Sequence, residues 1–269
     1  MFLILASFLL ASNAPLVVLD APSVPEPRVT FVQEDEEIED KRPEVKETLK
    51  QLAAHVKERG KEDQQAVAVI DRLVQEFDKS GPKDRKAIAA GVAKCLDAKR
   101  DLDPESEDMT IVLHAAAAVA LGRMGPESVK DLISAIDDKQ LKENLELQKY
   151  LILALGKTED PKGVKTLTGL LKHHEPRMQA AGAEALASFT SLGQDDRKEI
   201  VYEMIKIMMA LKSVVDTSPA DQIARERWDT ISGPIIGSLR ILTGHDEGEP
   251  EAWQRWWNKN KKEDWGERS

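Results

Sequence analysis

Few residues of this chain have the chemistry of a nucleophile, a general base or a metal ligand, and they are scattered. The five histidines are His55, His114, His173, His174 and His245. No two of them stand at the four-residue spacing that, with a carboxylate, forms a zinc site on one face of a helix. His173 and His174 follow a predicted helix end, where a cation complements the helix dipole. We therefore expect no metal site and assign no catalytic residue.

The single cysteine, Cys95, cannot form a disulfide or a thiolate metal site within one chain. It lies in the stretch AIAAGVAKCLDAK, one turn after Val92 and next to Leu96. This position is typical of a small buried hydrophobic residue, so we interpret Cys95 as part of the core and not as a nucleophile.

Two short stretches resemble ligand-binding loops only in part. Gly156, Lys157 and Thr158 match the end of a phosphate-binding loop, but Leu151 stands where that loop needs a glycine, and no strand precedes it. Residues 245–251, HDEGEPE, offer oxygen ligands without the alternating acidic spacing of a calcium loop. We interpret the first as a chance similarity and the second as a turn. No cofactor is expected.

The composition favours an all-α protein. Of the 269 residues, 32% are charged and 41% hydrophobic, while only 4% are aromatic. Strong helix formers dominate, and runs that alternate β-branched or aromatic residues with polar ones are missing from the sequence. We therefore expect almost no β-strand.

The acidity of the chain is concentrated at its start. The formal net charge is −10, and residues 1–40 carry −7 of it, which leaves −3 for residues 41–269. A protein that binds nucleic acid needs a basic stripe on one face, and the body offers none. We therefore expect no nucleic-acid partner.

The first 43 residues contain two segments that differ in composition. Residues 1–19 are apolar and uncharged, which predicts a signal peptide or an N-terminal anchor over 1–20. Ser12, Asn13 and Ala14 suit a cleavage site, although Pro15 follows at once and no basic residue precedes, so both alternatives stay open. Residues 21–43 are rich in proline and acid and are predicted to form a disordered linker.

From residue 44 to 243 the apolar residues follow the period of helices. Val45, Leu49, Leu52 and Val56 recur at steps of three and four before Gly60, and similar stripes continue through the body. Two to four residues separate most of these predicted helices. Short connections force neighbouring helices to run antiparallel, so we expect a succession of helical hairpins.

Three segments of the body repeat one plan. Residues 120–136 and 154–171 both begin with Ala-Leu-Gly, continue through a proline and end in an apolar stripe, and residues 185–208 repeat the plan with an insertion in the turn. The units begin 34 and then 31 residues apart, within the range of two-helix repeats. Such a hairpin cannot bury its apolar face alone, so the units must stack.

These motifs, together with EPRMQAAGAEALA at 175–187, resemble the HEAT-repeat family of α-solenoids. A tetratricopeptide-like or armadillo-like assignment of single units also fits. The segment 239–257 is similar to the end of exported bacterial HEAT-like proteins of unassigned role. The resemblance implies a right-handed α-solenoid of stacked antiparallel helix pairs over 44–243, acting as a scaffold.

Two further groups in the body have alternative interpretations. Met204, Met208 and Met209 could form an adaptable groove, but we favour the filling of gaps between packed helices. Gly233 and Pro234 should break or kink a helix, with Trp228 packed across the bend.

Four of the five tryptophans fall in the last 22 residues, within the segment 244–269. Trp253, Trp256 and Trp257 stand at i, i+3 and i+4, so they share one face of a helix opened by Pro250, and Trp265 follows. The terminal repeat of a solenoid exposes an apolar face, so we expect this segment to fold back as a cap. The alternative is an aromatic and basic surface that meets a membrane interface or an anionic partner.

Together these features predict a non-enzymatic protein-protein interaction scaffold of the periplasm or cell envelope. We expect a monomer that binds another protein and that touches a membrane only through residues 1–20, if they are uncleaved. One alternative is a HEAT-like repeat enzyme of the lyase or base-excision type. Another is a membrane-surface protein that uses both the apolar start and the tryptophan-rich end.

Overall fold

The computed structural model describes residues 40–107 and 109–265, and in these residues the protein is all-α, as predicted. The predicted signal or anchor (1–20) and the linker up to residue 39 lie outside the described residues. No strand occurs in the described part. The α-helices are α1 (Pro43–Lys57), α2 (Asp63–Phe77), α3 (Pro82–Ala93), α4 (Val112–Arg123), α5 (Val129–Asp137), α6 (Leu145–Lys157), α7 (Val164–Leu170), α8 (Pro176–Leu186), α9 (Gln194–Thr217), α10 (Gln222–Thr243) and α11 (Pro250–Asn260).

Local sequence signals account for most helix ends. Prolines occupy the first turn of α1, α3, α8 and α11, where the missing N–H costs no hydrogen bond. The side chains of Asn144 and Asp221 accept backbone N–H groups at the starts of α6 and α10. Gly244 ends α10 in the left-handed conformation, with φ of 66°. Short 3₁₀ turns, Gly125–Ser128, Leu141–Glu143 and Pro161–Gly163, join several helices.

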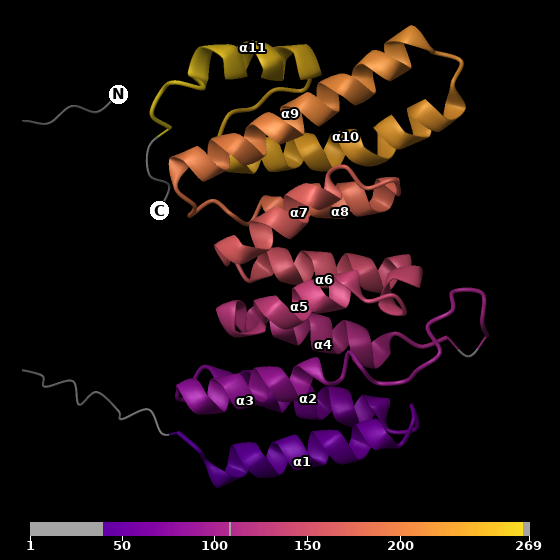
Figure 1. The fold of residues 1–269 in the computed structure, drawn as a ribbon, viewed down its shortest axis with the longest axis vertical. Coiled ribbons are helices and arrows are strands. Elements are labelled where there is room, and N and C mark those ends of the chain that lie inside the picture. Colours follow the sequence, from indigo (N-terminus) through magenta and orange to yellow (C-terminus); the bar gives the residue numbers. More distant parts are fainter. Residues whose placement is uncertain (1–39, 108, 266–269) are drawn as a thin grey trace, which may run out of the picture. The chain divides into compact units, whose positions relative to one another are not determined.

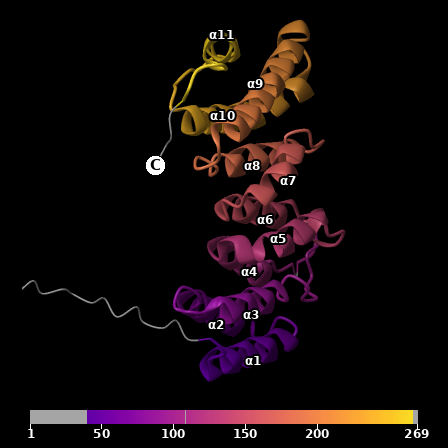
Figure 2. The same cartoon turned by 60° about the vertical axis from the view of Figure 1, so that its left-hand side comes forward.

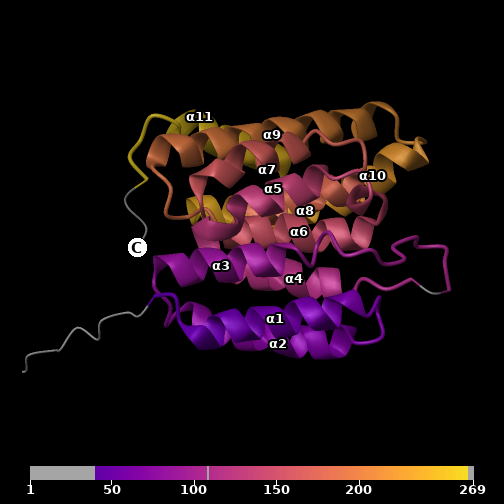
Figure 3. The same ribbon diagram turned by 60° about the horizontal axis from the view of Figure 1, so that its bottom comes forward.

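The helices pack in two sets, which we call the even row (α2, α4, α6, α8 and α10) and the odd row (α1, α3, α5, α7 and α9). Members of the even row pack closely against one another in chain order. Each odd helix covers one or more even helices, whereas successive odd helices touch only at a few points. Figures 1 and 2 show this succession of hairpins from α1 to α10. The described parts of the connection between α3 and α4 project from the helices (Figures 1 and 3).

The glycines of the Ala-Leu-Gly motifs mark places where neighbouring even helices approach closely. A Cβ added to Gly122 would lie 3.0 Å from the Cα and carbonyl oxygen of Ala154, which begins the next Ala-Leu-Gly. A Cβ added to Gly156 would lie 2.6 Å from the carbonyl oxygen of Ala185, which begins the third unit. The glycine of one unit therefore packs against the alanine of the next, and this contact sets the spacing of the row.

Side-chain hydroxyls bind the carbonyl oxygens of two motif leucines. The hydroxyls of Ser128 and Thr158 donate to the carbonyl oxygens of Leu121 and Leu155, the leucines of the first two motifs, at 2.6 and 2.7 Å. The same carbonyl oxygens also accept the backbone N–H groups of Met124 and Thr158, at 3.1 and 3.3 Å, so these hydroxyls add a second bond at the helix ends.

One polar position does recur, six residues before the alanine of each motif, at His114, Gln148 and Gln179. All three side chains are buried. His114 Nε2 lies 3.0 Å from the carbonyl oxygen of Ala98, and Gln179 Nε2 donates to that of Leu171. These two side chains thus bind α4 and α8 to the chain segments that precede them.

The folded body begins before the predicted boundary at residue 43. The Asp40 carboxylate accepts the N–H groups of Lys83 and Asp84, both at 2.9 Å, at the start of α3. Lys41 and Arg42 in turn donate backbone N–H groups to the Asp84 carboxylate. Residues 40–43 are therefore bonded to the body and are not part of a disordered linker.

Gly233 and Pro234 do not break the helix in which they lie, because α10 continues from Gln222 to Thr243. Of the two expected effects, a break or a kink, the break is therefore wrong. The helix is packed between α8 and α9, and the hydroxyl of Ser238 donates to the carbonyl oxygens of both Pro234 and Ala183. Tertiary packing thus offsets the hydrogen bond that the proline removes.

The predicted gap-filling role of the methionines is confirmed for two of the three. Met204 and Met208 are fully buried, and Met209 is partly buried against the core. Trp228 is also partly buried. Within the described residues, no helix combines the length and the apolar character that a membrane crossing requires.

The close approach at Gly156 predicts that Gly156→Ala lowers the free energy of unfolding by about 1–3 kcal/mol, because a methyl group has no room beside Ala185. Gly169→Ala is the matched control, since a Cβ there meets nothing within 4 Å and alanine favours the helix by up to about 1 kcal/mol. Urea unfolding measures both. Equal stabilisation by the two substitutions would contradict the packing described.

Burial lowers the pKa of His114 below its ordinary value of 6.5. The unfolded chain therefore takes up a proton at a higher pH than the folded chain, and stability falls as the pH drops from 6.5 toward the lowered pKa. The two later units have glutamine at this position. We therefore expect the substitution His114→Gln to reduce the loss of stability at low pH. Thermal unfolding at pH 7.5 and pH 5.5 checks this. An unchanged difference between the two pH values would count against it.

Candidate functional site

Cys95 and the stretch Gly156–Thr158, which the sequence analysis considered for chemistry or ligand binding, take part in structural contacts. Cys95 is 1% exposed, and burial raises the pKa of its thiol to about 12 against the opposing effect of Arg100. The thiol is therefore protonated at neutral pH, and its predicted place in the core is confirmed. Gly156 and Lys157 lie within α6, and the Thr158 hydroxyl is bonded to Leu155, so this stretch forms no phosphate-binding loop.

The histidines occupy separate elements. His55 lies 2.6 Å from the Glu62 carboxylate, and His245 lies 3.1 Å from that of Glu247. The rings of His173 and His174 lie 4.3 Å apart, and burial, followed by the neighbouring His174, lowers the pKa of His173. No group of three or more histidine, cysteine or carboxylate side chains in the described residues could hold a metal ion.

The four predicted tryptophans come together in one aromatic cluster, which consists of Trp253, Trp256, Trp257 and Trp265 with Tyr202 and His245. Trp253 is fully buried, and its indole N–H donates to the carbonyl oxygen of Glu247 at 3.0 Å. Trp257 is 8% exposed and stacks on Tyr202, with ring centroids 5.6 Å apart. These two indoles pack inside the protein.

The other two indoles are partly buried. His245 stacks on Trp256 with centroids 5.2 Å apart. The backbone N–H of Trp265 donates to the side chain of Gln194, and the Lys198 ammonium lies 5.3 Å from the Trp265 ring centroid. Because Gln194 and Lys198 belong to the first turns of α9, the aromatic cluster fastens the end of the chain to that helix.

A surface that the sequence analysis missed lies on the even row. One hollow in it is lined by Val74 of α2, Val119 of α4 and Tyr150 of α6, and a second by Leu153 of α6, Ala187 beyond α8 and Ile241 of α10. Both hollows include α6, so they adjoin one another. The two hollows also include the charged residues Asp71, Arg123 and Glu184. Their apolar residues form what we call the apolar strip: Val74, Ala116, Val119, Tyr150, Leu153, Ala187, Pro234 and Ile241.

Several residues of the apolar strip are well exposed. Val119 is 43% exposed, Tyr150 38% and Ile241 52%. Val119 and Leu153 immediately precede the alanines of the first two motifs, and Glu184 holds this position in the third unit. The sequence of α4 could have indicated this exposed apolar surface. This helix has no polar side chain between His114 and Arg123, so it is apolar on every face.

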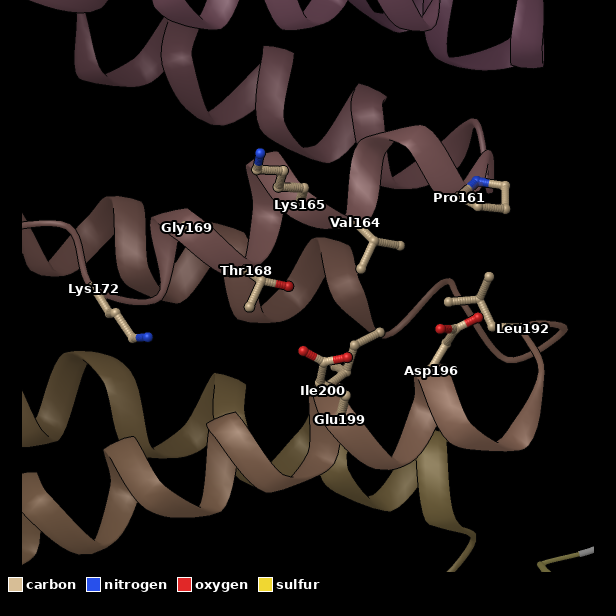
Figure 4. Close-up of a pocket in the computed structure, with 10 residues that line it drawn as sticks. All are labelled: Pro161, Val164, Lys165, Thr168, Gly169, Lys172, Leu192, Asp196, Glu199 and Ile200. Atoms are coloured by element: carbon tan, nitrogen blue, oxygen red, sulfur yellow. The ribbon is translucent and has the colours of Figure 1, made fainter.

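A groove of about 400 Å³ separates α7 from α9 in the odd row. Figure 4 shows its lining, in which Val164 of α7 faces Ile200 of α9 and Leu192 lies at one end below Pro161. Gly169 leaves part of the α7 wall without a side chain. The insertion noted in the third unit supplies the turn that precedes α9, and Leu192 belongs to that turn.

Comparisons with known proteins do not place the chain in a family. No family model matches it, and no curated protein and no solved structure matches it. The resemblance to HEAT repeats rests on the motifs of the sequence, and the repeat register rests on the contacts between Gly122 and Ala154 and between Gly156 and Ala185.

The burial of Trp253 predicts that Trp253→Ala lowers the free energy of unfolding by about 3–5 kcal/mol, because the substitution leaves a large cavity and breaks the bond to Glu247. Trp256→Ala, at a partly buried position in the same cluster, should cost less. Guanidinium unfolding followed by circular dichroism measures both. A Trp253→Ala protein as stable as the parent would show that the cluster does not hold the terminal segment.

Proposed function

We propose that this chain is a non-enzymatic scaffold that binds another protein through the exposed face of its even row. The proposal includes a right-handed α-solenoid of stacked antiparallel helix pairs, of the HEAT type. Its support is the order of contacts, in which α2, α4, α6, α8 and α10 follow one another and each is covered by an odd helix. In a solenoid the stacked repeats create a concave surface that serves for binding.

The unequal spacing of the two rows indicates which face is concave. Successive even helices pack closely, with glycine-to-alanine contacts in two of the pairs, whereas successive odd helices touch only at a few points. A stack in which one row is closer than the other curves toward the closer row. The even row therefore lines the inner side of the proposed curve.

The apolar strip is the observation that carries the proposal. Apolar side chains exposed together on several helices contribute nothing to a core and mark an interaction site in soluble proteins. Val119, Tyr150 and Ile241 project from three different helices of the even row. A partner that covers the strip would remove these side chains from water, and this burial would favour association.

The terminal segment completes the proposed scaffold. The helix α11 packs against α9, which belongs to the last hairpin, and Trp253 is buried there. We interpret this as the cap that a solenoid needs at its final repeat. The predicted export signal or anchor places the partner in the periplasm or cell envelope, and we propose a monomer.

The proposal predicts that Val119→Glu combined with Tyr150→Glu weakens partner binding by about tenfold or more, because two carboxylates would be buried in an apolar interface. The matched control is Val214→Glu combined with Ile223→Glu, since these residues are 49% and 80% exposed and lie outside the strip. Affinity capture from envelope extracts with each full-length protein identifies the partner, and titration with the purified partner measures the loss.

The result separates two interpretations. Proteins captured by the parent and by the control, but not by the strip variant, support binding through the even row. A partner lost equally from both variants, or retained by both, would contradict the assignment of this face.

A further inference from the structure

The groove between α7 and α9 has a chemical character that the apolar strip does not share. Its floor is apolar, with Val164, Leu192 and Ile200 in the lining. Two carboxylates, Asp196 and Glu199, stand one turn apart on the α9 side, and both are exposed. Neither has an ion-pair partner among the described residues. The groove thus combines apolar surface with uncompensated negative charge.

The two lysines of the lining do not neutralise this charge. The Lys172 ammonium pairs with Glu203 at 3.0 Å, and this hydrogen bond is the main cause that lowers the pKa of Glu203. Lys206 also pairs with Glu203, at 3.4 Å. In Figure 4 the side chain of Lys165 points away from α9.

The favourable effect of acidic residues on the start of a helix does not by itself explain why Asp196 and Glu199 border the groove. Acidic residues in the first turn of a helix favour its dipole, and Asp195 and Asp196 both occupy that turn of α9. Asp195 lies outside the groove, whereas Asp196 and Glu199 border its apolar floor. The Thr168 hydroxyl points toward the same space from α7 (Figure 4), which adds a hydrogen-bonding group opposite the carboxylates.

We propose that this groove binds a lysine or arginine side chain from a basic segment of a protein partner. The aliphatic stem of such a side chain packs against the apolar floor, while its cationic head meets Asp196 and Glu199. A space of about 400 Å³ exceeds one side chain, so apolar residues that flank the basic one also enter the groove. This site lies on the odd row and does not depend on binding through the even row.

The test is a fluorescence-anisotropy titration of the full-length protein with labelled peptides. The first peptide alternates lysine and leucine, and the second has glutamate in place of each lysine. We expect the lysine peptide to bind, and Asp196→Asn combined with Glu199→Gln to weaken this binding by about tenfold. The matched control is Asp195→Asn combined with Asp229→Asn, which removes the same charge from exposed positions outside the groove.

A third variant tests the groove without changing charge. Gly169→Leu fills part of the space, and the fold should tolerate it because a Cβ at this position meets nothing within 4 Å. This substitution should also weaken the binding of the lysine peptide by about tenfold. Circular dichroism verifies that each variant is folded. Equal weakening by the control pair would show general attraction to an acidic protein and would overturn the proposal. Unchanged binding to the Gly169→Leu protein, or equally tight binding of the glutamate peptide, would overturn it as well.

Discussion

The contact between a glycine of one even helix and an alanine of the next is the constraint on which the rest of the structure depends. At Gly156 the neighbouring backbone is so close that a Cβ would require a shift, and at Gly122 a Cβ would be in tight contact with Ala154. The even row is therefore compact, and the odd helices that cover it lie farther apart. The groove between α7 and α9 lies in this more widely spaced row.

Much of the fold could be predicted because its signals are local. Apolar residues at steps of three and four predicted where the helices lie, and prolines such as Pro250 indicated where they begin. The burial of Met204 followed from neighbours on the same helix, and that of Cys95, just beyond the end of α3, from Val92 and Leu96 close by in the sequence. The spacing of Trp253 and Trp257 placed both indoles on one helical face, and both are buried.

The features that could not be predicted depend on residues distant in the sequence. Asp40 and Arg42 are fixed by Asp84, about forty residues later, so composition alone assigned them to a linker. Pro234 lies in an unbroken helix that packs against both α8 and α9, elements that the local sequence does not reveal. The apolar strip was missed for the same reason, since its side chains become neighbours only when five helices lie in a row.

The repeat register separates residues that hold the row together from residues that can give it specificity. The position occupied by Ala120, Ala154 and Ala185 is alanine in all three units, and at Ala154 and Ala185 a larger side chain would push against the neighbouring glycine. The position immediately before it is valine, leucine and then glutamate, and these side chains line the hollows of the even face. A change there leaves the helix spacing intact. The fold can therefore alter its proposed binding face one unit at a time without disturbing the contact that sets its architecture.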